Sequence, residues 1–307
     1  MLRFLQHWIE YTGYSIIYYA LRALPLETGV ALSAWLWRHL APRFYRHERA
    51  RHNIQRAMPT LKPAEVEGIL DGMWANLGAT MAESLQLDRI IRDPSRIEIN
   101  PIGEVGAILN TRGDAIFVSG HLGSWEISAI AVSSLGIEIA GVYQKVLNPY
   151  VERDVFQSRL PFYRAGLFMK GHHAVIAFKN ALKNGQSIAL MADLRDVRGY
   201  LVNFFGIPAP STTFPALLAR YSGAPIIGAR TVRIGKCRFR VDLVEIPVVK
   251  TDDRDNDLAK NTTSIQKVLE SWISEQPDQW MWAHRLCDVK ALNKEPQRNT
   301  KIKESDH

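Results

Sequence analysis

The fold is decided by residues 114 to 126, which read DAIFVSGHLGSWE. Residues 115 to 119 are a short apolar run, rich in strand-forming residues, which predicts a buried strand. Residues 127 to 135 have helical character and end before Gly136. His121 is therefore expected on the turn between a strand and a helix.

The polar residues of this turn suggest acid–base chemistry. Reacting groups collect at the carboxyl ends of strands in open α/β sheets, which is where His121 is predicted to lie. Glu126 is too distant in sequence to share a helical face with His121, but a turn that folds back can bring its carboxylate to the imidazole. Such a carboxylate fixes the ring tautomer and leaves the other nitrogen free to take a proton from a hydroxyl. The alternative is a packed or solvated histidine without a catalytic role.

Composition limits the domain size, the partners and the kinds of site to be expected. The chain of 307 residues is long enough for one large domain or two small ones, and its 47% hydrophobic content can fill a substantial core. Its formal charge of +7 favours an anionic partner, such as nucleic acid, an acidic membrane surface or an acidic carrier. No nucleic-acid-binding motif is recognisable, so nucleic acid is not expected as a partner. The two cysteines, Cys237 and Cys287, form no C-x-x-C pair, which fits a reducing compartment and argues against a disulfide framework or a zinc site.

Residues 1 to 40 are dominated by aromatic and aliphatic side chains. The stretch from residue 14 to 37 approaches the roughly 20 residues of a membrane span, but Arg22, Pro25 and Glu27 interrupt it. We therefore predict a hydrophobic helical membrane anchor, either a helical hairpin or a segment lying at the interface; a single span, or two helices of an ordinary core, are the alternatives. Arginines and histidines follow between residues 38 and 56, a pattern that suits attraction to anionic headgroups.

The rest of the chain alternates strands and helices. Strands are predicted at residues 96–100, 115–119, 137–143, 168–170, 186–192, 225–232 and 239–246, and helices at 62–90, 103–111, 127–135, 150–163, 174–183, 214–221 and 256–275. This pattern predicts an α/β fold with a mixed, mostly parallel central sheet flanked by helices, the last strand being antiparallel. One domain is expected from 41 to 289, followed by a polar, disordered tail at 290–307.

Two further segments bear on the predicted site. Asp193 follows the strand at 186–192 and is expected on the same rim as His121. Residues 203 to 213 are interpreted as a loop whose terminal hydroxyl residues cap the next helix. The amino end of a helix can accept a phosphate or an oxyanion, and capping alone is the alternative role of these residues.

Five sequence blocks occur together in order. They are His121 to Glu126, Val142-Tyr143 with Asn148-Pro149, Asp193, Phe204 to Ala209, and Asp278 to Arg285. The set resembles the bacterial lipid A lauroyl and myristoyl acyltransferase family, a branch of the glycerolipid and lysophospholipid acyltransferase superfamily. The resemblance implies an enzyme on the cytoplasmic face of the inner membrane. It would move a fatty acyl chain from acyl carrier protein to a hydroxyl of a lipid A precursor, with no metal or other cofactor.

The resemblance also implies roles for individual residues. His121 would be the general base and Glu126 its orienting carboxylate, while Asp193 matches the family aspartate after the third strand. The family arginine falls on Arg159, with Arg164 as the second choice. Arg159 or backbone N–H groups near Gly123 would stabilise the oxyanion. No serine nucleophile is required.

Two departures from the family pattern leave the acceptor open. Gln144, followed by Lys145, stands where the family often has arginine, and Leu286 stands where a second arginine is common. A lysophospholipid or another glycolipid is therefore an alternative acceptor. A non-catalytic lipid-binding or scaffold protein, in which His121 and Glu126 are merely structural, is the alternative from another class.

Overall fold

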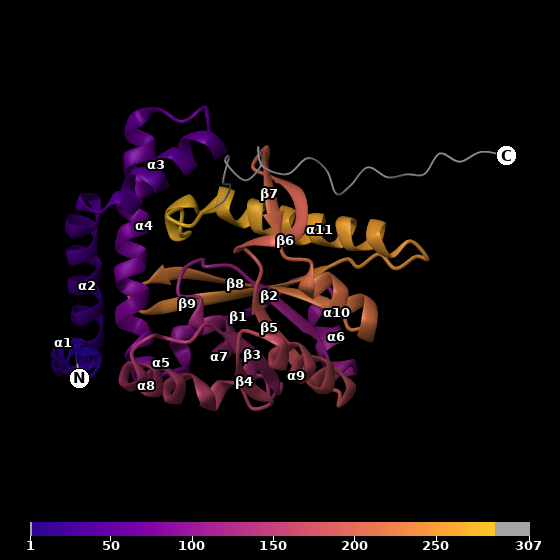
Figure 1. Ribbon diagram of the computed structural model, residues 1–307, viewed down its shortest axis with the longest axis horizontal. Helices are drawn as coiled ribbons and strands as arrows, with labels where there is room; N and C mark the ends of the chain where they lie inside the picture. Colours follow the sequence, from indigo (N-terminus) through magenta and orange to yellow (C-terminus); the bar gives the residue numbers. More distant parts are fainter. Residues whose placement is uncertain (1, 286–307) are drawn as a thin grey trace.

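The computed structural model describes residues 2–285 and is built around a mixed sheet (Figure 1). The predicted tail and Cys287 lie outside these residues. The described part of the chain forms a seven-stranded sheet of order β1-β9-β8-β2-β5-β3-β4. Its strands are β1 (Ile97–Pro101), β2 (Ile116–Ser119), β3 (Ile139–Tyr143), β4 (Gly166–Met169), β5 (Ser187–Met191), β8 (Ile226–Gly235) and β9 (Arg238–Ile246). Every neighbouring pair is parallel except β8 and β9, so the predicted fold class is confirmed for the sheet.

Helices cover both faces of the sheet. They are α1 (Leu2–Ala23), α2 (Leu26–Leu40), α3 (Tyr45–Ala57), α4 (Pro63–Ser84), α5 (Leu87–Ile91), α6 (Val105–Thr111), α7 (Glu126–Ser134), α8 (Pro149–Arg159), α9 (His172–Lys183), α10 (Phe214–Ser222) and α11 (Arg254–Glu275). Short 3₁₀ turns are η1 (Ala41–Arg43), η2 (Pro94–Arg96), η3 (Leu160–Phe162) and η4 (Pro277–Gln279). The predicted helix at 150–163 ends earlier, because Pro161 cannot continue an α-helical hydrogen-bond ladder.

The central strand β2 divides the apolar core into two halves. Side chains alternate across a strand, so Ile116 and Val118 pack in one half, with residues of α9, α10 and α11. Ala115 and Phe117 pack in the other half, with residues of α6 and α7. Residues 115–119 are buried throughout, as the continuous apolar run predicts.

The N-terminal segment consists of two helices that separate at Pro25. Among the described residues, no helix is both long enough and apolar enough to cross a membrane, so the structure gives no support to the predicted N-terminal membrane anchor. Instead, α2 lies beside α4, which lies next to the end of β8 (Figure 1). Gly78 allows this close approach, since a Cβ there would lie 2.6 Å from the carbonyl oxygen of Ser33.

The segment interpreted as a loop is instead half of a β-hairpin. Strands β6 (Arg195–Phe204) and β7 (Ile207–Ser211) form a separate antiparallel ribbon. Strand β7 contains two prolines, Pro208 and Pro210, although proline cannot donate to a ladder. A two-stranded ribbon tolerates them, since each of its strands is an edge.

Candidate active site

The register of two parallel strands brings His121 and Asp193 together. Ser119 of β2 is paired with Met191 of β5, and the two strands run in the same direction. His121 and Asp193 each follow these paired residues by two positions, so they leave the sheet at the same edge. The sequence predicted this shared rim, but not that β2 and β5 are direct neighbours.

The carboxylate of Asp193 accepts hydrogen bonds from His121 twice. Its Oδ1 lies 2.9 Å from Nδ1 of the ring, and its Oδ2 accepts the backbone N–H of His121 at 2.6 Å. An ionised carboxylate only accepts hydrogen bonds, so Nδ1 must carry the ring hydrogen. The tautomer then leaves Nε2 as the basic nitrogen.

The third donor to Asp193 comes from a distant part of the chain. The indole Nε1 of Trp280, which follows η4, donates to Oδ2 of Asp193 at 2.9 Å. Trp280 also forms an isolated antiparallel bridge with Leu122, and the N–H of Met281 donates to the carbonyl of His121 at 3.3 Å. The segment after η4 therefore holds both partners of the His121–Asp193 pair.

Aromatic side chains of the β6–β7 turn support this segment. The ring of Phe204 packs edge-on against Trp280, and the ring of Phe205 packs against Trp282. From the other side, the amide of Asn53 in α3 donates to the carbonyl of Trp282 at 2.8 Å. Four of the five sequence blocks, those containing His121, Asp193, Phe204 and Trp280, thus meet at one place.

Burial and charge act in opposite directions on the pair. The Asp193 side chain is fully buried and that of His121 is 18% exposed. Burial alone would lower the pKa of His121, but the negative charge of Asp193 outweighs it and raises that pKa above its usual value. Burial alone would raise the pKa of Asp193, but His121 holds it well below its usual range.

Glu126 has a different partner from the one expected. Its carboxylate forms a two-pronged ion pair with Arg159, in which Nε donates to Oε2 at 3.1 Å and Nη2 donates to Oε1. The carboxylate on the imidazole is that of Asp193, because Asp193 follows the strand next to β2, whereas Glu126 opens α7. Glu126 nevertheless contributes its charge to raising the pKa of His121. The predicted orienting contact of Glu126 on the ring therefore belongs to Asp193.

Gly123 and Arg164 are the remaining predicted site residues. The N–H of Gly123 donates to the carbonyl of Gln279 at 2.9 Å, so that donor is committed to the loop rather than to an oxyanion. Gly123 has a φ of +53°, and a Cβ there would lie 2.3 Å from the carbonyl oxygen of Thr231. Arg164 lies between η3 and β4, and among the described residues no hydrogen bond or ion pair joins it to His121, Glu126 or Asp193.

A second imidazole was missed as a site residue. The ring of His284 lies 4.8 Å from that of His121, centre to centre. Burial and the nearby His121 lower the pKa of His284 to about 4, so it is neutral near pH 7. Its place in the quoted block 278–285 was the only available signal. Within residues 2–285, no group of three or more histidine, cysteine or acidic side chains could hold a metal ion.

The Asp193 contact predicts how His121 titrates. We expect Asp193→Asn to bring the pKa of His121 below the wild-type value, because burial then acts against a weaker opposing interaction. The measurement is an NMR titration of histidine-labelled protein, with the signal assigned by its loss in His121→Ala. An unchanged pKa in Asp193→Asn would show that this carboxylate does not govern the ring.

Comparisons with known proteins place the chain in a family. A comparison with curated proteins gave no match. A family model described as bacterial lipid A biosynthesis acyltransferase matches residues 1–287, which is nearly the whole chain. The match confirms the resemblance inferred from the five blocks and the prediction of an O-acyltransferase. The chain belongs to the bacterial lipid A biosynthesis acyltransferase family.

Proposed function

We propose that this enzyme moves a fatty acyl chain from acyl carrier protein to a hydroxyl of a lipid A precursor, with His121 as general base. The family membership implies a lipid A precursor as acceptor. The observation that carries the proposal is the hydrogen bond between Nδ1 of His121 and Asp193, at 2.9 Å. It prepares Nε2 to accept a proton from a hydroxyl.

The chemistry needs one base and one oxyanion donor. Nε2 of His121 takes the proton of the acceptor hydroxyl while that oxygen attacks the thioester carbonyl. The tetrahedral intermediate collapses by breaking its carbon–sulfur bond, and His121 returns the proton to the departing thiolate. The products are an ester and the free thiol of the carrier, so no metal or cofactor is needed.

Arg159 is our proposed donor to the oxyanion. Its guanidinium is three-quarters buried, with 25% of the side chain exposed, and Glu126 engages it through Nε and Nη2. A guanidinium has five N–H groups, so donors remain after this pairing. In this account Glu126 orients Arg159 rather than His121. Arg164 remains a second candidate for contact with the acceptor.

A narrow cavity beside the site is the proposed entrance for the acyl chain. Its lining is predominantly apolar and includes Trp125, Val132, Val142 and Met191. The ring of Trp125 lies 5.1 Å from that of His121, so the cavity adjoins the predicted base. Apolar lining suits a hydrocarbon tail, since hydrocarbon is driven out of water.

The transfer assay tests this function directly. Labelled acyl chains on acyl carrier protein are offered to the purified wild type with a Kdo-bearing lipid A precursor. Loss of the base in His121→Ala should lower kcat by about 10²- to 10⁴-fold. His172→Ala is the matched control, because that histidine, at the start of α9, is exposed and has no hydrogen bond or ion pair to the His121–Asp193 pair among the described residues.

Failure of the wild type to transfer, given a competent donor, would contradict the lipid A assignment. Lysophospholipid and other glycolipid acceptors would then be tested in the same assay. Gln144 and Leu286, which stand where the family often has arginine, are the residues that favour this alternative. Full activity in His121→Ala would contradict the role of the base and return His121 to a structural role.

We further propose that the enzyme works at the inner-membrane surface, on its cytoplasmic face. The outer faces of α1 and α2 expose many large apolar side chains: Phe4, Leu5, Trp8, Ile9, Ile16, Ile17, Tyr19, Leu32, Trp35, Leu36 and Leu40. Such faces suit insertion into the headgroup region of a bilayer. Arg46 and Arg49 of α3 lie close enough to His284 to help lower its pKa, so positive charge lies near the site for an anionic carrier or headgroup.

Vesicle binding tests the surface. The double substitution Trp35→Ser and Leu36→Ser should weaken binding to phosphatidylglycerol vesicles by at least about tenfold, because a buried large apolar side chain contributes about 1.5–3 kcal/mol. Co-sedimentation measures the change. Val249→Ser is the control, since Val249 is 39% exposed and lies between β9 and α11, outside α1 and α2. Equal loss in both variants, or none in either, would contradict the proposed surface.

A further inference from the structure

We propose that Arg233 and Thr80, together with Asn76 and Glu83, are positioning residues for His121. They fix the backbone of Gly123 and thereby the direction in which the imidazole leaves the sheet. The inference rests on the proposed role of His121 as base. None of the four residues belongs to the five sequence blocks, and none touches the predicted reacting atoms.

The backbone of Gly123 is held on both sides. Its carbonyl accepts the hydroxyl of Thr80 at 2.9 Å and the amide of Asn76 at 3.3 Å. Its N–H donates to the carbonyl of Gln279 at 2.9 Å. Gly123 follows His121 by two residues and has a left-handed backbone, so a shift here changes the path of the chain at the base.

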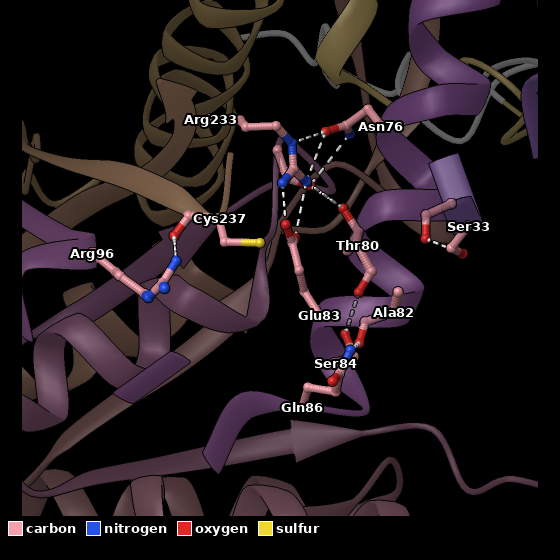
Figure 2. A network of polar contacts seen from close by, with 12 residues as sticks. Ser33, Asn76, Thr80, Ala82, Glu83, Ser84, Gln86, Arg96, Arg233 and Cys237 are labelled. Carbon is pink, nitrogen blue, oxygen red and sulfur yellow. Dashed lines mark hydrogen bonds and ion pairs between the residues drawn. The ribbon is translucent and has the colours of Figure 1, made fainter. Parts of the chain in front are cut away.

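Arg233 determines the direction of both donors. Its guanidinium donates to Oδ1 of Asn76 and to the hydroxyl oxygen of Thr80, each at 3.2 Å (Figure 2). The amide of Asn76 must then direct its NH₂ group away from Arg233 and toward the carbonyl of Gly123. The hydroxyl of Thr80 accepts from Arg233 and therefore gives its own hydrogen to the same carbonyl.

Glu83 keeps Arg233 in place. Its carboxylate is fully buried and receives two hydrogen bonds from the guanidinium, one of them 3.0 Å long (Figure 2). A buried charge without a partner is costly, so neither side chain can leave while the other stays. The pair therefore acts as a fixed support between α4 and β8.

The same arginine also reaches the other side of the site. Its backbone N–H donates to Oε1 of Gln279 at 2.9 Å. Gln279 is bonded to Gly123 through its carbonyl and directly precedes Trp280, which donates to Asp193. One cluster thus aligns the turn that carries His121 with the segment that holds its carboxylate partner.

Thr80 offers the sharpest test, because one hydroxyl can be removed without changing the shape of the side chain. Thr80→Val removes the donor to Gly123, and Thr80→Ser keeps it. Ser33→Ala is the matched control. The hydroxyl of Ser33, in α2, donates at 2.7 Å to the carbonyl of Gly78, which lies on α4 as Thr80 does but outside the cluster. Two readouts are used, steady-state acyl transfer and the NMR titration of His121.

We expect Thr80→Val to lower kcat about 10- to 100-fold with little change in KM, as small misplacements of a catalytic group do. The pKa of His121 should also fall, because its contact with Asp193 loosens. The charged or titratable groups that face the ring are Asp193, Glu126 and His284, and all three are still present in Thr80→Val. A change in the pKa of His121 therefore reports a change in geometry. Thr80→Ser should restore most of kcat, and Ser33→Ala should behave as wild type.

A second pair of variants tests Arg233. Arg233→Gln is compared with Arg230→Gln, which breaks another buried ion pair on β8, that with Asp242. Both should lower the thermal unfolding midpoint, but only Arg233→Gln should lower kcat per folded molecule. If Arg233→Gln fails to fold, the Thr80 pair decides.

The outcomes separate this proposal from the proposed function. Wild-type kcat together with a wild-type His121 pKa in Thr80→Val would overturn the positioning role while acyl transfer stands. If the wild type transfers to no acceptor, the proposed function fails, but the NMR titration of His121 still tests the positioning role. A lowered His121 pKa in Thr80→Val but not in Ser33→Ala would support the positioning role, and equal values would overturn it.

Discussion

The structure of the site depends on the buried carboxylate of Asp193. A charge with no exposure to water must be compensated by hydrogen bonds and opposite charge. Here the compensation comes from the backbone and ring of His121 and from the indole of Trp280. These donors belong to segments that are far apart in sequence. The hydrogen bonds of this carboxylate therefore form only when β2, β5 and the segment after η4 are all in place together.

Much of the surrounding structure serves this requirement. The β6–β7 turn places Phe204 against Trp280, and α3 holds the carbonyls that follow η4 through Asn53. Thr80 of α4 donates to the carbonyl of Gly123, and the buried ion pair of Arg233 and Glu83, between β8 and α4, supports Thr80. In the chain, α2 is followed by the short turn η1 and then by α3, whose Asn53 holds the segment after η4. The apolar surface proposed to meet the membrane is therefore linked to the site through α3.

The sequence predicted the elements better than the contacts between them. Apolar runs such as 115–119 are local signals, and all seven strands of the main sheet were anticipated within a few residues. Strand order is not local: β5 lies beside β2 although β3 and β4 intervene in the chain. That adjacency brings the carboxylate of Asp193 to the ring of His121, and no spacing in the sequence reveals it. Glu126 was the nearest carboxylate in sequence, and in the structure it pairs with Arg159 instead.

Other residues were hidden for similar reasons. Arg233 and Glu83 are separated by 150 residues and carry no motif of their own, so only the fold identifies them as partners. The hairpin was missed because its prolines resemble loop signals. Trp280 and His284, by contrast, stood within a quoted block. Sequence pattern could point to that block as important, but not to the atoms that its side chains contact.

The most direct measurement of the account is a double-mutant cycle on the rate of acyl transfer, using His121→Ala, Asp193→Ala and the double variant. Residues that act as one unit lose their effect together. The account predicts that the double variant is no slower than His121→Ala alone, so that the two losses are far from additive. Losses that multiply, with the double variant slower by the product of the single effects, would contradict the dependence of the base on Asp193.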